Sequence, residues 1–146
     1  MRPAGFSPPG PTGPCLEDPN ACLGPAYFEM DDTGLAQPGN LFVFETSDPA
    51  TIHHGRLIVT GMSQCNRSVM AQTYHGTQWY NPDWAFHIDG DIWFFGSNIH
   101  APDYCDQTAD WVQAHLGWWC PARGGLLCGY WCPWDSTLVR EVDPQQ

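Results

Sequence analysis

Six histidines are the side chains of this chain best suited to binding a metal ion. They stand at positions 53, 54, 75, 87, 100 and 115, and no pair has the two-residue spacing of a strand or the four-residue spacing of a helix. A metal site would need the fold to bring distant residues together, and His87 with His75 or His100 is the predicted set. Imidazole suits zinc or copper, and an open coordination position would permit chemistry. One hypothesis is therefore a zinc- or copper-binding protein or metalloenzyme.

Motifs for nucleophilic catalysis or calcium binding are missing from the chain. The Gly-x-Ser-x-Gly elbow that exposes a catalytic serine is absent, and Ser63, Ser68 and Ser97 lie in no comparable pattern. Asp89-Gly90-Asp91 lacks the further oxygen ligands and the terminal glutamate of a calcium loop. We therefore predict no catalytic residue and no firm cofactor, and we expect a non-catalytic protein.

Aromatic residues are the most unusual feature of the composition. The chain holds eight tryptophans, and seven large rings fall within residues 79–95. A sheet of a domain this size buries about five or six such rings, given the area that each ring needs. The remainder must reach the surface, where Trp and Tyr commonly contact partners. This predicts a binding or assembly module that presents aromatic surface to a protein partner, a glycan or copies of itself, with Tyr80, Trp118 and Trp119 among the contact residues.

Charge narrows the range of partners. Sixteen Asp and Glu against five Arg and no Lys give a net charge of −11. Such a field repels phosphate backbones and leaves no basic stripe, so nucleic-acid binding is not expected. Cationic partners, metal ions and neutral ligands remain open. The sequence has no run of about 18 apolar residues, so we expect no transmembrane segment.

Seven cysteines indicate an oxidising compartment. They stand at positions 15, 22, 65, 105, 120, 128 and 132, with no Cys-x-x-Cys pair and no spacing typical of a zinc finger. This load is typical of a disulfide framework in a secreted protein, and Asn66-Arg67-Ser68 is an N-glycosylation sequon. We expect a secreted, extracellular glycoprotein with one cysteine free or joined to another chain. A weaker alternative is an inhibitor of secreted proteases, with loop 117–130 as its reactive segment.

The hydrophobic pattern predicts the elements that must position these residues. Strands are expected at 41–46, 67–74, 84–88, 92–95 and 137–142, from their β-branched and aromatic runs. One helix is expected from the N-cap Asp48 to Gly61, and another from Asp106 or Thr108 to Gly117. Asp89-Gly90 predicts a tight hairpin turn between two strands. The order predicts a disulfide-stapled α+β fold, with a mainly antiparallel sheet of about four to five strands and two helices packed on one face.

Residues 1–40 are expected to lie outside this domain. Seven prolines and four glycines fall within residues 1–26, a composition that suits neither a helix nor a central strand. We predict an extended proline- and glycine-rich arm over residues 1–40 and a single α+β domain over residues 41–146. The arm and Cys65 are the two candidate routes to a homo-oligomer.

Several segments resemble one known family. Tyr80-Asn-Pro-Asp-Trp84-Ala-Phe-His87 is similar to the Tyr-Asn-Pro-x-Trp-x-Phe-His segment of a microbial domain family named for the amino-terminal domain of a calmodulin-binding protein. Its other motifs are matched in the same order by Asp48-Pro-Ala-Thr-Ile52, Cys105-Asp106, Trp131-Cys-Pro-Trp134 and Leu138-Val-Arg-Glu-Val142. The resemblance covers residues 41–142 and implies a structural or binding role for Asn81, Trp84 and His87. The chain departs from the family in a shorter turn at Asp89-Gly90 and in five additional cysteines.

The pairing of the cysteines follows from two sources. The resemblance implies a Cys105–Cys132 bridge. Cys120 with Cys128, and Cys15 with Cys22, bracket short turn-forming segments, so these pairs are predicted from the residues themselves. Cys65 then remains over. An alternative stays open, in which Cys65 pairs with Cys15 or Cys22 and ties the arm to the sheet.

Overall fold

The computed structural model describes residues 15, 17–31, 41–95, 105–120, 127–133 and 136–144 of the chain. Within them a short 3-10 turn, η1 (Pro19–Ala21), precedes the strands and α-helices. The strands are β1 (Ala26–Asp31), β2 (Leu41–Thr46), β3 (Ser68–His75), β4 (Phe86–Phe95), β5 (Leu127–Trp131) and β6 (Thr137–Val142). The helices are α2 (Pro49–Val59), α3 (Ala109–Ala114) and α4 (Leu116–Trp119). None of these helices is long and apolar enough to cross a membrane.

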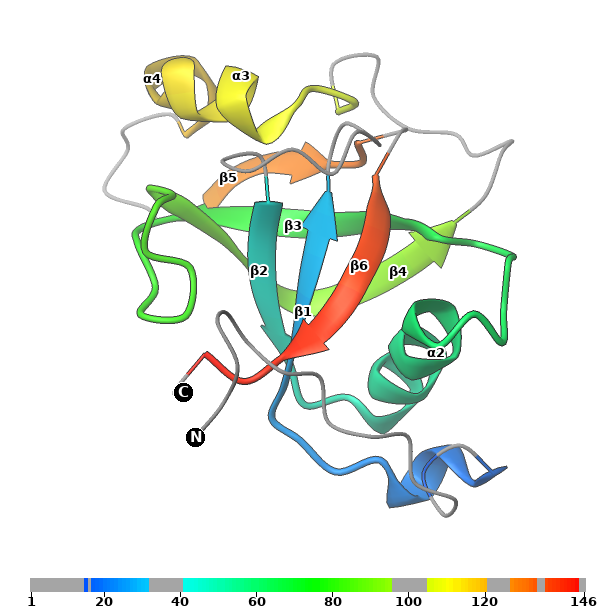
Figure 1. The fold of residues 1–146 in the computed structure, drawn as a ribbon. Coiled ribbons are helices and arrows are strands. Elements are labelled where there is room, and N and C mark those ends of the chain that lie inside the picture. Colours follow the sequence, from blue (N-terminus) through cyan, green and yellow to red (C-terminus); the bar gives the residue numbers. More distant parts are fainter. Residues whose placement is uncertain are drawn as a thin grey trace.

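The described strands form two antiparallel sheets, with the orders β2-β1-β6 and β4-β3-β5. In Figure 1 the strands of the first sheet run up the view and cross in front of the strands of the second sheet. The predicted α+β fold with antiparallel pairing is confirmed. The expected single sheet of four to five strands is corrected to two three-stranded sheets, because β1 and β5 were not recognised beside their prolines and glycines.

The core lies where the two sheets face each other. Phe28 on β1 and Phe42 and Phe44 on β2 are fully buried, as the alternation of side chains along a strand requires. The ring of Phe42 lies 5.1 Å from the ring of Phe86 on β4 and 5.0 Å from the ring of Trp131 on β5. Such aromatic pairs contribute about 0.5–1.5 kcal/mol each beyond the area that they bury. They fasten one sheet to the other.

Helix α2 begins and ends where the sequence predicts. The Asp48 carboxylate accepts a hydrogen bond from the backbone N–H of Thr51 at 2.9 Å, which caps the helix. The chain turns away at Gly61, whose φ of +78° suits glycine. Gly55 lets the helix approach β1 closely, since a Cβ there would lie 2.7 Å from the Cζ atom of Phe28. This contact fixes α2 on the first sheet.

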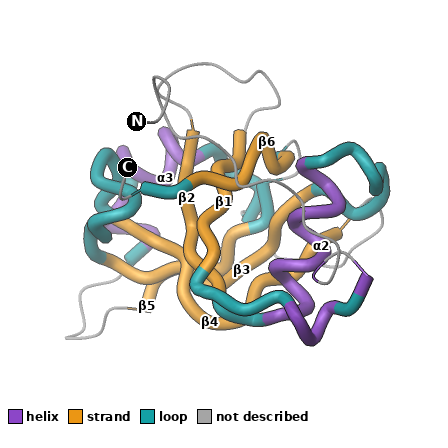
Figure 2. The backbone as a smooth tube through the Cα atoms, turned by 60° about the horizontal axis from the view of Figure 1, so that its bottom comes forward, coloured by secondary structure: helices purple, strands orange, loops and turns teal. Residues whose placement is uncertain are grey.

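The helices lie at opposite ends of the sheets and not on one face as expected. Figures 1 and 2 show α2 beside β6, whereas α3 and α4 lie at the far end of the molecule. The disulfides give the reason for this second position. Cys105 bonds to Cys132 after β5, and Cys120 bonds to Cys128 within β5. The α3–α4 pair is therefore fastened at both its ends to the second sheet.

The hairpin turn predicted at Asp89-Gly90 is wrong. Strand β4 runs unbroken through these residues and pairs with β3 on both sides of them. Ala71 lies opposite Ile92, and Thr73 lies opposite Ile88, so β4 has two more residues than β3 in this interval. Gly90 has a φ of +87°, which a β-bulge uses as readily as a tight turn does. The local signal is the same for both, and pairing with β3 decides between them.

The domain boundary predicted at residue 41 is too late. Strand β1 lies at the centre of the first sheet, between β2 and β6, although its residues were assigned to the arm. Its buried side chains include Phe28 and Met30, which pack into the core. Residues 1–14, 16 and 32–40 of the predicted arm lie outside the described residues. Core packing therefore extends to the chain on the amino-terminal side of residue 41.

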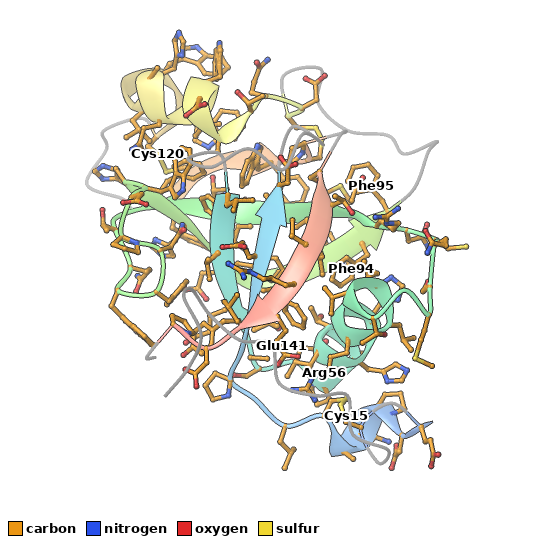
Figure 3. All side chains as sticks on the ribbon, in the orientation of Figure 1. Cys15, Arg56, Phe94, Phe95, Cys120 and Glu141 are labelled. Carbon is orange, nitrogen blue, oxygen red and sulfur yellow. A yellow bond between two sulfur atoms is a disulfide. The ribbon has the colours of Figure 1, made fainter. Side chains whose placement is uncertain are left out.

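The amino-terminal disulfide is docked on α2. Cys15 bonds to Cys22 around η1, and the carbonyl oxygen of Cys15 lies 2.8 Å from Nδ1 of His53. Arg56 donates to the Cys15 sulfur at 2.8 Å and to both carboxylate oxygens of Glu141 on β6, at 2.8 and 2.9 Å. Figure 3 shows Arg56 between Glu141 and Cys15. The three expected bridges are thus present, and Cys65 is an exposed free cysteine.

Candidate functional site

The Tyr-Asn-Pro-x-Trp segment joins the loop before β4 to the edge of the first sheet. Asn81 Oδ1 accepts a hydrogen bond from the backbone N–H of Val43 at 3.0 Å. The Trp84 indole N–H donates to the carbonyl oxygen of Leu41, also at 3.0 Å. Both partners belong to β2, an edge strand whose backbone would otherwise be open to another chain. Asn81 and Trp84 are buried, so the geometry gives them a structural role.

Four described histidines, His53, His54, His87 and His115, direct a ring nitrogen to a backbone carbonyl oxygen at 2.7–3.2 Å. A carbonyl oxygen can only accept, so this nitrogen carries the proton and is closed to a metal ion. In His87 the bonded nitrogen is Nδ1, which donates to Gly76, and Nε2 lies 3.4 Å from the amide nitrogen of Gln78. These histidines therefore serve the local backbone.

The predicted metal set is not assembled by the described residues. In the register of β3 and β4, His87 lies opposite Tyr74 and His75 lies opposite Phe86. Successive residues of a strand point to opposite faces, so His75 and His87 point apart. His100 lies outside the described residues. Across the described part of the chain, no three His, Cys, Asp or Glu side chains gather as a metal ion would require. The zinc or copper hypothesis gains no support from the geometry.

The two tryptophans predicted on the second helix have different environments. Trp119 is buried, and its indole N–H donates to Oγ1 of Thr73 at 2.9 Å. Trp118 is 58% exposed and makes an edge contact with Trp111, at a ring separation of 5.8 Å. Trp111 in turn stacks on His115. Of the predicted pair, only Trp118 is placed to contact a partner.

A cluster of three rings covers part of the outer face of the first sheet. Tyr27 on β1, Trp79 and Tyr80 lie with their ring centres 5.4–5.7 Å apart. Tyr80 is buried against Val43, whereas Trp79 is 53% exposed. Tyr80, a predicted binding residue, thus supports the ring that reaches the solvent. We call Tyr27, Trp79 and Tyr80 the Trp79 cluster.

Carboxylates surround the Trp79 cluster. The Tyr27 hydroxyl donates to Oε2 of Glu45 at 2.8 Å. Burial, this hydrogen bond and the charges of Glu45 and Asp143 raise the pKa of Tyr27 to about 12. Burial and the charges of Glu45 and Asp89 also raise the pKa of Tyr80 above its usual range. Both phenols therefore stay neutral at physiological pH, in a negative local field.

The outer face of the second sheet carries a row of partly exposed, uncharged side chains. Along β3 the buried residues alternate with four that point outward, Ser68, Met70, Gln72 and Tyr74. Trp93 on β4 lies opposite Met70, and Tyr130 on β5 lies opposite Gln72, so both rings share this face. Their ring centres are 6.1 Å apart. We call Met70, Gln72, Tyr74, Trp93 and Tyr130 the outer platform.

Trp93 differs from the buried tryptophans in its indole N–H. Trp84, Trp119 and Trp131 donate to Leu41, Thr73 and Gln107 within the protein. Trp93 is half exposed, and its N–H has no partner among the described residues. A tryptophan with a flat exposed face and an unused donor is suited to contact with a ligand.

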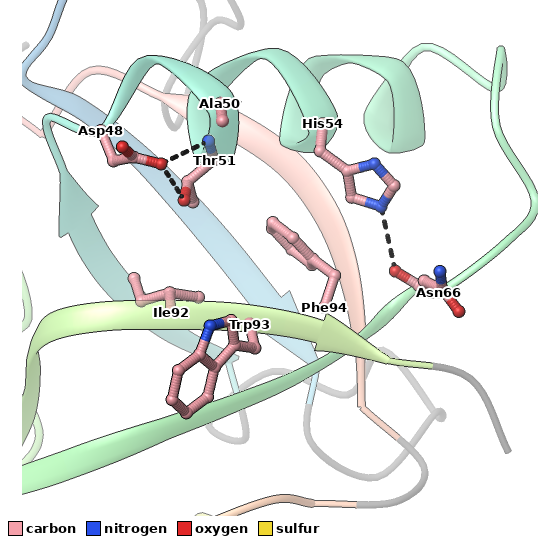
Figure 4. Close-up of a pocket in the computed structure, with 8 residues that line it drawn as sticks. All are labelled: Asp48, Ala50, Thr51, His54, Asn66, Ile92, Trp93 and Phe94. Atoms are coloured by element: carbon pink, nitrogen blue, oxygen red, sulfur yellow. Dashed lines mark hydrogen bonds between the residues drawn. The ribbon is translucent and has the colours of Figure 1, made fainter. Parts of the chain in front are cut away.

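A hollow of about 390 Å³ lies between α2 and β4. It is lined by Asp48, Ala50, Thr51 and His54 from the helix side, by Ile92, Trp93 and Phe94 from β4, and by Asn66. In Figure 4 the side chains of Ile92 and Phe94 point toward α2, whereas the indole of Trp93 points away from it. The Asp48 carboxylate caps α2, and the ring of His54 packs 4.7 Å from that of Phe94. Its polar groups therefore serve the helix, and Trp93 belongs to the outer platform.

Two further predicted features have only partial structural descriptions. Asn66, the sequon residue, is exposed and has a φ of +52°, next to the exposed Cys65. Its accessibility fits a modified side chain, and glycosylation stays a prediction. Within the predicted inhibitory loop 117–130, residues 121–126 lie outside the described residues. That hypothesis therefore has no geometry to stand on here.

Trp93 was missed as a site residue because the predicted hairpin placed it with core residues. With a bulge instead of a turn, the register of β3 and β4 puts it on the outer platform. Tyr27 was missed with β1. Glu45, the polar residue in the otherwise apolar run 41–46, was the one sequence signal that this strand has an outward face.

Comparison with known proteins places the chain by family alone. The family model that matches residues 24–145 is that of the N-terminal domain of a calmodulin-binding protein, the family that the sequence motifs resemble. The match begins before β1 and ends after β6, so it includes every described strand. No curated protein and no solved structure matches the chain.

Proposed function

We propose that this chain, which belongs to the family of that calmodulin-binding-protein N-terminal domain, is a secreted, non-catalytic binding module that holds a neutral glycan on its outer platform. The observation that carries the proposal is the Trp93 indole, which is half exposed on a sheet face beside a second aromatic ring. The core already buries Trp84, Trp119 and Trp131. Trp93 therefore costs apolar exposure without serving the core, as a contact residue does.

The chemistry of the platform favours a neutral ligand with one apolar face. A pyranose ring has a face of C–H groups and a rim of hydroxyls. The Trp93 indole would cover that face, and its N–H would donate to a hydroxyl. Gln72 is held in place because its amide nitrogen donates to the carbonyl oxygen of Cys128 at 2.6 Å. None of the five platform residues is charged, in a chain whose net charge is −11. A neutral sugar suits this face better than an ion does.

The disulfides support secretion and a rigid binding face. Such bonds persist in oxidising compartments outside the cytosol. Cys128 lies on β5 beside the platform residue Tyr130, and its bridge to Cys120 holds that strand to α4. A preformed face loses less entropy on binding than a mobile one does.

The test is a titration with a panel of neutral oligosaccharides, built from glucose, mannose, xylose or N-acetylglucosamine, followed by calorimetry. Trp93→Ala is the test variant and Trp118→Ala is its matched control, because Trp118 is similarly exposed on α4. We expect at least one oligosaccharide to bind, and Trp93→Ala to weaken it by roughly thirtyfold, the loss of about 2 kcal/mol typical of a central contact.

Trp118→Ala is expected to leave the affinity unchanged. Two results would count against the proposal: no neutral oligosaccharide binds, or Trp93→Ala binds as tightly as the native chain. Equal losses in both tryptophan variants would place the ligand elsewhere.

A further inference from the structure

The outer face of the first sheet differs in charge from the outer platform. Tyr27 at its centre lies opposite Glu45 on β2 and Val142 on β6. The cation on this face is Arg140, whose Nε donates to Glu29 at 2.8 Å. Glu45 accepts from the Tyr27 hydroxyl and has no cationic partner among the described residues. A carboxylate thus stands uncompensated beside an exposed indole.

The exposed indole is held firmly enough to act as a fixed contact surface. Trp79 packs edge-on against Tyr80, at 5.7 Å and an interplanar angle of 87°, and against Tyr27, at 5.5 Å and 67°. Tyr80 is buried, and Asn81, next in sequence, is bonded to β2. One ring of the Trp79 cluster therefore reaches the solvent, and the other two support it from below and beside.

We infer that the Trp79 cluster is a second contact surface, independent of the outer platform, which takes an Arg or Lys side chain of a partner protein. The cation would lie over the Trp79 indole and pair with the Glu45 carboxylate. Aromatic faces attract cations through their electron-rich surface, and tryptophan does so most strongly. The Tyr27 hydroxyl orients Glu45, since it donates to Oε2 and leaves Oε1 for the incoming cation.

Charge complementarity selects a basic segment as the occupant. The chain carries 16 Asp and Glu, five Arg and no Lys, so its field draws a cationic protein segment toward it over a distance. Asp143 and Asp89 add to the negative potential at the cluster, as their effects on the two tyrosines show. A second copy of this acidic chain would be repelled. The contact is therefore with a different, basic protein.

The test uses a capped decapeptide of alternating Arg and Gly, and its counterpart with the uncharged isostere citrulline in place of Arg. Binding is followed by tryptophan fluorescence and calorimetry at about 20 mM and about 500 mM salt, because screening lengths shrink as salt rises. We expect the Arg peptide to bind, the citrulline peptide to bind at least tenfold more weakly, and added salt to weaken the Arg peptide.

Matched variants separate the cluster from the general negative field. Trp79→Ala and Glu45→Gln are each expected to weaken the Arg peptide roughly two- to fivefold, the range of an exposed cation–aromatic contact. Trp118→Ala and Asp110→Asn are the controls, since both residues are exposed on the α3–α4 helices, and they are expected to change nothing. Glu45→Gln keeps an acceptor for Tyr27, so the fold is retained.

Three results would overturn the inference: equal losses in the control variants, equal binding of the citrulline peptide, or full affinity in Trp79→Ala. Failure of this test leaves the glycan proposal standing, because Trp93 lies on the other sheet. Conversely, a chain that binds no oligosaccharide but selects the Arg peptide through Trp79 would retain this inference alone.

Discussion

Replacing Asn81 with alanine tests whether the Tyr-Asn-Pro-x-Trp segment is structural. The side chain is 3% exposed, and its Oδ1 is bonded to the N–H of the buried residue Val43. Truncation leaves that N–H without its acceptor, which costs about 1–3 kcal/mol of the free energy of unfolding. The Asn81 amide nitrogen has no partner among the described residues, so nothing further is lost on that side. In a chain of this length, the loss corresponds to a fall of about 2–12 °C in the unfolding midpoint.

The assay is thermal and urea unfolding with the disulfides intact, and Asp83→Ala is the control because Asp83 is exposed in the same loop. We expect Asn81→Ala to lower the midpoint, Asp83→Ala to leave it unchanged, and both to bind oligosaccharides as the native chain does. Native stability of Asn81→Ala together with lost ligand binding would refute the reasoning and make Asn81 a contact residue.

Three other perturbations have outcomes fixed by the structure. Arg56→Met leaves Glu141 buried without its cation and is expected to lower the free energy of unfolding by about 3 kcal/mol; a loss under about 1 kcal/mol in urea unfolding would contradict the role of this ion pair. Gly129→Ala places a Cβ 2.7 Å from Cε2 of Trp119 and is expected to cost about 1–3 kcal/mol, whereas Gly117→Ala, with open space around it, serves as the unaffected control in thermal unfolding. The pKa of Tyr27, raised from 10.0 to about 12, favours the neutral phenol in the folded state, so this contribution to stability is present below pH 10.0 and lost as pH rises through about 12. Absorbance titration of tyrosinate should show one late-titrating group that moves to lower pH in Glu45→Gln, and an unmoved titration would disprove the assigned cause.

Local signals in the sequence were sufficient for the elements with strong boundaries. The Asp48-Pro49 start and Gly61 stop identify α2, and the alternating or apolar runs identify β2, β3 and β6. Thr108, one of the two predicted caps, accepts from the Trp111 N–H and begins α3. These features depend on neighbours within a few residues, which a sequence displays directly.

The elements that were missed depend on partners far away in the chain. β1 follows Gly24-Pro25 and is a strand because β2 and β6 pair with it on both sides. The bulge at Gly90 is decided by β3 in the same way. Trp93 could not be assigned to a face until that register was known. Asn81 and Trp84 were singled out by family resemblance, and the structure explains them through the backbone of β2.

The most direct measurement of the central claim is the NMR signal of each tryptophan indole N–H during titration with the best-binding oligosaccharide. The chain has eight such groups. Those of Trp84, Trp119 and Trp131 are bonded inside the protein and are internal controls. We predict that the Trp93 signal shifts in proportion to ligand bound while these three stay fixed. A titration in which Trp93 does not move, while another indole or none does, would contradict a glycan site on the outer platform.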